Sequence, residues 1–340
     1  MNRLRPWIDH FGSLRNTLAL MGLLAAVVLA GALAGTLFGA LLVVVLSLLA
    51  LQLLVGLVMH PGLRRQAPLA LFHVGLLVLG LQVGLSRLVS LDGRFELTEG
   101  LPFDGQLLDG REGPLHRRAL QRLSFSHLGF DIDYAPGRKR GATRNRVRWI
   151  DAEGREQQGV IGDHRPLVLD GHRITTTPNK GFAPLLQWQP TGGDAVLGAV
   201  HLPSFPAQEL QQSREWALPD GRLAWVMLDI EGTLIDPAAA ARFQLPERHR
   251  LVLRLDGQRW VLAPGERAEV PGGVLVYQGL RTWMGYRIHH DPLLPWLLAT
   301  ALATTAALAW HQARRFRSPA RRVQEGAHPA WKPGTGAADA

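Results

Sequence analysis

The long uncharged stretch from Thr17 to Met59 constrains the fold more than any other feature of this sequence. One helix needs about 20 apolar residues to cross a bilayer, so the stretch is long enough for two crossings. The small-residue segment 35–39 is the natural place for a tight turn between them. A cleavable signal peptide is the competing interpretation. The apolar stretch is far longer than the apolar region of a signal, and it has no small-x-small cleavage site followed by polar sequence.

Two further apolar stretches follow. Because the first stretch counts as two, they are the third, at 68–91, where Arg87 is the single charge, and the fourth, at 292–311. We therefore predict an integral membrane protein with four transmembrane helices, two within 14–60 and one in each later stretch. A large domain at 92–291 separates the third helix from the fourth. The remaining segments are an arm at 1–13, a loop at 61–67 and a polar basic tail at 312–340, which we expect to be disordered.

The basic residues show on which side of the membrane each part belongs. The formal net charge is +9. The segments 1–15, 64–65 and 314–340 hold about 11 basic residues against about 3 acidic ones, so the large domain is nearly neutral. Positive charge beside membrane helices marks the cytoplasmic face. We expect both termini in the cytoplasm of a bacterium and the domain on the periplasmic side of its inner membrane. The local basic run at 138–148 is interpreted as a solvated strand face, not a nucleic-acid site.

The domain at 92–291 has the pattern of antiparallel β structure. Short alternating segments are separated by Gly, Pro and Asp, and tight turns are expected at 151–154, Asp170-Gly171 and Asp256-Gly257. One helix is expected, at 206–216. The alternation predicts a sandwich or open barrel. The expected strands are 94–98, 129–134, 147–150, 223–230 and 251–255.

The same domain offers no recognisable catalytic motif. It has no Gly-rich phosphate loop, no Gly-x-Ser-x-Gly and no His-Glu-x-x-His, so we predict no catalytic residue. The chain has no cysteine, which excludes a thiol-disulfide carrier and thioether-bound haem. The domain is therefore interpreted as a binding or scaffolding module. Its scattered histidines are expected at the surface or in turns: His116, His127, His164, His172, His201 and His249.

His73 is the most informative residue because it lies inside the third apolar stretch, about 9 Å from its cytoplasmic end. A titratable ring in hydrocarbon is costly, so a functional site is the first hypothesis. Gly80 and Gly84 fall on the same helical stripe and allow close approach of a helix or a flat ligand. The stripe suits an axial ligand of haem iron beside a glycine-lined groove. A histidine bonded to a neighbouring helix, with the glycines used for packing alone, is the alternative.

His289 and His290 precede the fourth apolar stretch, at the expected outer surface of the membrane. This pair is a second candidate for binding haem or a metal. The alternative is two interfacial histidines that end a strand ahead of a helix begun by Pro292.

Several segments resemble the ResB proteins of System II cytochrome c biogenesis. The segment 71–77 with Gly80 is the most specific of them and resembles the third helix of that family. The departures are a bare turn in place of the outer loop between the first two helices, a shorter outer domain, and His164 where the family has Asn. The other similar segments are 31–37, Gly93, Glu99-Gly100, 166–171 and 277–292.

The resemblance implies a membrane subunit that helps to pass haem to the outer face for attachment to apocytochrome c. It implies His73 as an axial ligand of non-covalent haem b, with the opposite ligand from a CcsA-type membrane partner. The chain would then be a non-catalytic or co-catalytic subunit of a haem-attachment complex. A non-haem scaffold or sensor, whose periplasmic β domain binds a partner protein, is the competing function, and haem spectroscopy separates the two.

Overall fold

The computed structural model describes residues 14–31, 37–59, 65–116, 120–151 and 153–317. It divides into two compact units, one made of residues 1–88 with 292–340 and one made of residues 89–291. The predicted arm at 1–13, the tail beyond 317, and parts of the expected turn at 35–39 and loop at 61–67 lie outside the described residues.

The described residues of the first unit form four helices, α2 (Leu14–Gly31), α3 (Leu37–Met59), α5 (Ala67–Val89) and α6 (Leu294–Arg317). Helices α2 and α3 pack together through Val27, Leu42 and Val45. Among the described residues, α5 is the one helix that is long and apolar enough, by length and composition, to cross a membrane. The four-span topology therefore stays a prediction.

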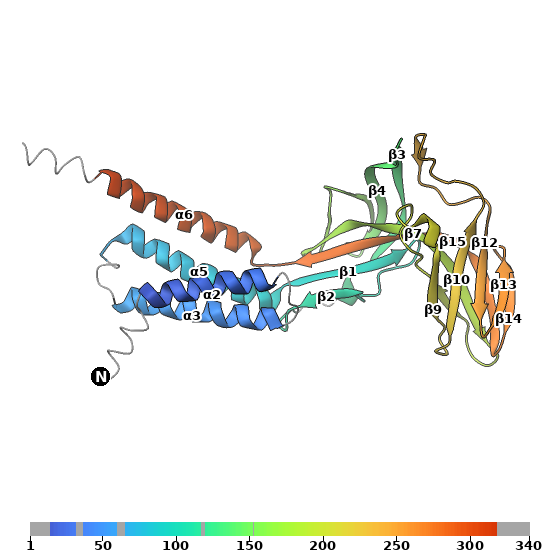
Figure 1. Ribbon diagram of the computed structural model, residues 1–340, viewed down its shortest axis with the longest axis horizontal. Coiled ribbons are helices and arrows are strands. Elements are labelled where there is room, and N and C mark those ends of the chain that lie inside the picture. Colours follow the sequence, from blue (N-terminus) through green and yellow to red (C-terminus); the bar gives the residue numbers. More distant parts are fainter. Residues whose placement is uncertain (1–13, 32–36, 60–64, 117–119, 152, 318–340) are drawn as a thin grey trace, which may run out of the picture. The chain divides into compact units, whose positions relative to one another are not determined.

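The second unit is built almost entirely of antiparallel strands (Figure 1). It has three sheets, in the strand orders β2-β1-β15-β7-β6, β13-β12-β10-β9 and β11-β3-β4-β5, with β14 added to β15 and β8 added to β7. The strands are β1 (Leu91–Thr98), β2 (Asp109–Glu112), β3 (Phe125–Ala135), β4 (Lys139–Ile150), β5 (Glu156–Gly162), β6 (Leu167–Leu169), β7 (His172–Pro190), β8 (Val196–Ala199), β9 (Ser213–Ala217), β10 (Leu223–Ile230), β11 (Ala241–Arg242), β12 (His249–Leu255), β13 (Gln258–Leu262), β14 (Arg267–Val270) and β15 (Gly273–His290).

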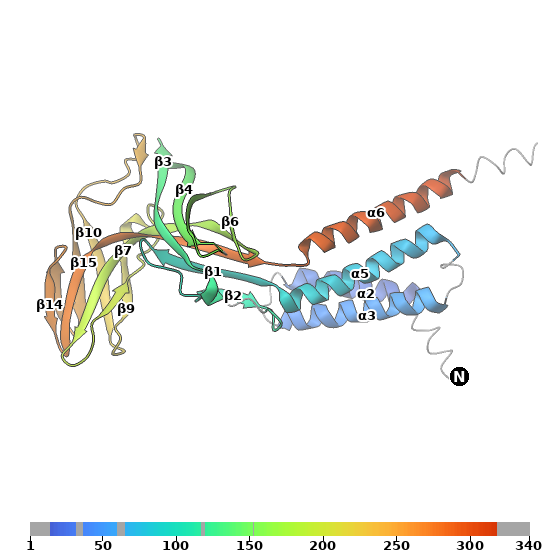
Figure 2. The ribbon, with the colours of Figure 1, turned by 180° about the vertical axis from the view of Figure 1, so that it is seen from behind.

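Two long strands, β7 and β15, pair along nearly their whole length and connect the parts of this unit. Figures 1 and 2 show β3 and β4 along one half of these strands, and β9, β10 and β12 around the half that carries β14. One continuous apolar core fills both halves. At its centre Tyr286 of β15 stacks on Phe95 of β1 and meets Phe125 of β3 edge to face, with ring centroids 5.1 and 5.3 Å apart. Such aromatic contacts add to the stabilisation that area burial gives.

The strands and turns expected from the sequence are largely confirmed. All five expected strands lie within β1, β3, β4, β10 and β12. The two Asp-Gly turns have positive φ at both residues, 45° and 77° at Asp170-Gly171 and 50° and 80° at Asp256-Gly257, as a tight hairpin requires. The helix expected at 206–216 is wrong. That segment forms a 3₁₀ turn at Glu209–Gln211 and then strand β9, because the backbone of Ser213–Ala217 pairs with β10.

Candidate functional site

His73 lies in the second turn of α5, and a hydrogen bond within the helix fixes its ring. Its Nδ1 lies 2.7 Å from the carbonyl oxygen of Leu69. A carbonyl only accepts, so Nδ1 carries the proton and Nε2 keeps its lone pair. Metal-ligating histidines commonly have this arrangement, in which a backbone carbonyl holds one nitrogen and the other binds the metal.

Gly80 and Gly84 leave open space beside α5. A Cβ built on either would meet no described atom within 4 Å. The close helix contact of α5 is at Gly75 instead, where a Cβ would collide with the side chain of Thr304 of α6. Position 75 is about 200° around the helix from position 73, so the stripe of His73, Gly80 and Gly84 is on the side away from this contact. The stripe is therefore a face of α5 that Thr304 of α6 does not cover.

The structure places His289 and His290 on opposite faces of β15. His289 is exposed, with Nδ1 3.7 Å from a carboxylate oxygen of Asp92, which also binds the guanidinium of Arg287. His290 is buried. Neighbouring side chains of a strand point to opposite faces, so these two histidines cannot hold one ion together.

Three histidines that are far apart in the sequence meet at one end of the largest sheet. His290 ends β15, His172 begins β7, and His116 follows β2 by four residues. The ring centroid of His290 lies 5.3 Å from that of His116 and 4.8 Å from that of His172. The centroids of His116 and His172 are 5.5 Å apart. One nitrogen from each ring can be chosen so that all three lie within 4.8 Å of one another.

Sequence reasoning missed this cluster because it treated the histidines one by one. The expectation of a surface or turn position is wrong for His172 and for His127, which are fully buried in strands β7 and β3. It holds for His116, which ends a turn that begins at Gly113, but the side chain of His116 is only 1% exposed. The pairing of Leu91 with both His290 and Glu112 brings the elements together, and such register is not local information. One signal was present: His172 directly follows the Asp170-Gly171 turn, and His290 directly precedes the last apolar stretch.

A second group of buried polar side chains surrounds His127, and its hydrogen bonds form a chain in which each donor and acceptor is defined. Tyr286 donates to Asn145 Oδ1 at 2.7 Å, and Asn145 Nδ2 donates to His127 Nδ1 at 2.7 Å. The proton of His127 is then on Nε2, which lies 3.2 Å from the hydroxyl of Thr282, and that hydroxyl donates to Glu99 at 2.7 Å. Burial, with help from the charge of Arg146, lowers the pKa of His127 to about 3. The group is thus a neutral brace between β3, β4 and β15.

The basic run on β4 is paired with carboxylates. Arg140, Arg144 and Arg148 lie 3.3, 3.0 and 3.7 Å from Asp163, Asp133 and Glu156. These pairs are largely exposed and supply little stability, but they neutralise the run. The pairing agrees with the interpretation of a solvated strand face.

The fold and the site define a strand-rich domain of three antiparallel sheets, joined at both ends to long apolar helices. No family model matches the chain, and no curated protein matches it. Among solved structures it is similar to one described as "Cytochrome c Heme Lyase CcmF", with 12% identity and a TM-score of 0.24. The alignment covers 88% of this chain and 34% of that one, so the chain spans about a third of the length of that structure. Similarity at this level assigns neither a fold nor a function.

Proposed function

We propose that this chain is a membrane subunit of a System II type cytochrome c maturation complex, in which His73 supplies one axial ligand to a non-covalent haem b. The opposite ligand comes from a CcsA-type membrane partner. The complex delivers haem to the periplasmic face, where apocytochrome c receives it. The name of the distant structural neighbour belongs to the same theme, but the support comes from the residues of α5.

One observation carries the proposal: His73 holds its Nδ1 on the carbonyl of Leu69 and leaves Nε2 to bind. The hydrogen bond fixes the tautomer and the ring plane and raises the basicity of Nε2, as it does in known metal-ligating histidines. Haem iron accepts such a nitrogen as an axial ligand.

The open space at Gly80 and Gly84 is the second support. Side chains at these positions would fill the surface on which a porphyrin edge lies, about two and three helical turns beyond His73. The Thr304 contact at Gly75 leaves this stripe free, since it fixes α6 to the other side of α5. In this proposal α6 supports α5 while the partner protein closes the haem site.

The test is to replace His73 by Ala in the full chain, co-expressed and purified with its partner. We expect the wild-type complex to carry haem with a low-spin spectrum, since two nitrogen ligands give a strong field. The variant loses haem or turns high-spin while its amount in the membrane stays unchanged. Imidazole added to the variant restores part of the low-spin spectrum and part of cytochrome c maturation, because it fills the space left by the ring.

A matched control is His311→Ala, a histidine on α6. It should leave haem content unchanged. Gly80→Leu is the complementary variant, because it retains the ligand but fills the groove, and it should reduce haem content. Full haem content and full maturation in His73→Ala would overturn the assignment and favour the scaffold or sensor function.

A further inference from the structure

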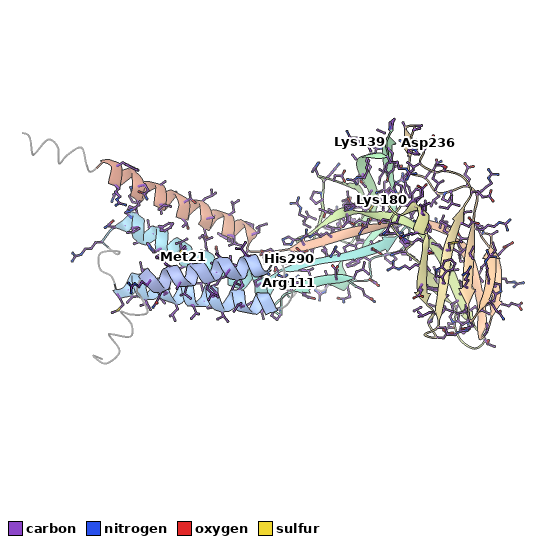
Figure 3. The ribbon with its side chains drawn as sticks, viewed as in Figure 1. Met21, Arg111, Lys139, Lys180, Asp236 and His290 are labelled. Atoms are coloured by element: carbon purple, nitrogen blue, oxygen red, sulfur yellow. The ribbon has the colours of Figure 1, made fainter. Side chains whose placement is uncertain are left out.

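The cluster of His116, His172 and His290 has the composition and placement of a metal site. It is independent of the haem proposal, since it lies wholly within residues 89–291 and shares no residue with α5. Figure 3 labels His290 at the end of β15, with Arg111 of β2 at the same end of the sheet. Here β1 enters the domain and β15 leaves it.

The strands position two of the ligands, and one short connection positions the third. Leu91 pairs with His290 on one side and with Glu112 on the other, so β2, β1 and β15 end in one row. His172 starts β7, the next neighbour of β15, immediately after the Asp170-Gly171 turn. Sheet register therefore fixes the positions of His172 and His290, which gives a site its precision, and a turn of four residues connects His116 to β2.

Glu112 orients His116 as a carboxylate orients a metal ligand. Its Oε1 lies 3.0 Å from Nδ1 of His116, so this nitrogen donates and Nε2 holds the lone pair. Nε2 is buried and has no hydrogen-bond partner among the described residues. A buried acceptor without a partner costs about 1–3 kcal/mol. A metal ion bound to that nitrogen satisfies it, and metal-ligating histidines are commonly held by a carboxylate on the other ring nitrogen, as here.

We propose that these three histidines bind a divalent transition-metal ion of the borderline class, with Zn²⁺ as the best match. Three imidazole nitrogens with no carboxylate among them disfavour Mg²⁺ and Ca²⁺, which prefer oxygen. A tetrahedral ion with Zn–N bonds of about 2.0–2.1 Å needs nitrogens about 3.3 Å apart. The nitrogens lie within 4.8 Å of one another, so on binding they approach by up to about 1.5 Å. Rings 4.8–5.5 Å apart have room for an ion but not for a porphyrin, so haem is excluded here.

The ion ties three segments together at the end of the sheet. It links the connection after β2, the start of β7 and the end of β15, and it leaves a fourth position for water or another ligand. His290 is four residues before α6 begins, so the site anchors the strand end that leads into that helix. Loss of the metal is expected to loosen this end of the domain.

The test uses the untagged full chain in detergent, stripped with a chelator. Titration with Zn²⁺ against a chromophoric chelator should give one tight equivalent, and Co²⁺ should give the intense visible bands of a tetrahedral ion, which Zn²⁺ abolishes. His290→Gln should lower the Zn²⁺ affinity by about 100-fold or more, and Glu112→Gln, which retains all three ligands, by about 10- to 100-fold. His289→Gln, on the opposite face of the same strand, is the matched control and should bind as the wild type does.

Two results overturn the proposal. One is a stripped wild-type chain that takes up no tight equivalent of Zn²⁺. The other is wild-type affinity for Zn²⁺ in both single variants, Glu112→Gln and His290→Gln. If His290→Gln does not fold, the wild-type titration and Glu112→Gln still decide, because neither removes a ligand.

Discussion

At the scale of single residues, the buried polar groups divide into a brace and a candidate site. His127 has both ring nitrogens bonded to protein, and its neighbours Asn145 and Tyr286 continue the network. A fully satisfied buried network rigidifies a core. His116, by contrast, has one buried nitrogen with no hydrogen-bond partner among the described residues. Burial alone therefore does not separate the structural histidine from the candidate ligand. The difference is whether the second ring nitrogen has a hydrogen-bond partner among the described residues.

The first prediction concerns the pH dependence that His127 gives to folding. Its pKa is about 3 in the folded protein against 6.5 when unfolded, so the unfolded chain binds the proton first. The stability it provides is complete above pH 6.5 and falls as the pH decreases toward 3. At pH 5 the loss from this group is about 2 kcal/mol. Denaturant unfolding of the full chain, followed by the β signal in circular dichroism at pH 7 and pH 5, measures it.

The control for this prediction replaces the group that titrates. His127→Gln should be less stable at pH 7 but should lack most of this loss between pH 7 and pH 5. His164→Gln, in an exposed turn, should retain the wild-type dependence. An equal pH dependence in His127→Gln and the wild type would contradict the role given to His127.

At the scale of elements, local chemistry in the sequence predicts strands and turns but not their partners. Alternation identified β10 and β12, and Asp256-Gly257 identified the turn between β12 and β13, because both signals act over a few residues. The wrong helix at 206–216 arose because Ala, Gln and Glu have high helix propensity, whereas the pairing of 213–217 with β10 decides the structure. The histidine cluster needed the register of β1, β2 and β15, which no local pattern contains.

The helices give a second example of what the sequence leaves open. The sequence pointed to Gly80 and Gly84 as places of close approach, but Gly75 is where α6 contacts α5. Gly80 and Gly84 are four residues apart and form the small-residue pattern, whereas Gly75 lies outside it. The choice depends on which face of α5 meets Thr304, and that depends on the partner helix. The sequence shows that His73, Gly80 and Gly84 share one face of the helix, but it does not show that α6 packs on the opposite face.

The second prediction tests the α5–α6 contact. Gly75→Val places methyl groups where Thr304 now lies, so it should destabilise the packing of the helices by about 1–3 kcal/mol. Thr304→Ala should recover part of this loss in the double variant, because it removes the colliding hydroxyl. Gly22→Val, on α2 where a Cβ meets nothing within 4 Å, is the matched control. Unfolding in mixed micelles by helical circular dichroism measures all four chains, and equal effects of the two valines would contradict the contact.

At the scale of the whole molecule, the charge pattern predicts that the helical unit lies in a bilayer and the strand-rich unit in water. The helices α3, α5 and α6 have 23, 23 and 24 residues and so are about 35 Å long, against a hydrocarbon thickness of about 30 Å. Helix α6 exposes Trp296 near its start and Trp310 near its end, about 21 Å apart, as in the aromatic belts of membrane helices. Arg314 lies over the ring of Trp310 at 4.6 Å, on the side that we expect to face the cytoplasm.

The last prediction is the topology, on which the path proposed for haem depends. With four crossings, a reporter fused after Gly100 lies in the periplasm and one fused after Pro319 lies in the cytoplasm. Alkaline phosphatase should therefore be active only at the first position and green fluorescent protein should fluoresce only at the second. A third fusion, within 61–67, should match the second, because two helices precede it. Equal signals after Gly100 and Pro319 would mean that α6 does not cross. A third fusion that matches the first would mean that α5 does not cross, and His73 would then not lie in a transmembrane helix.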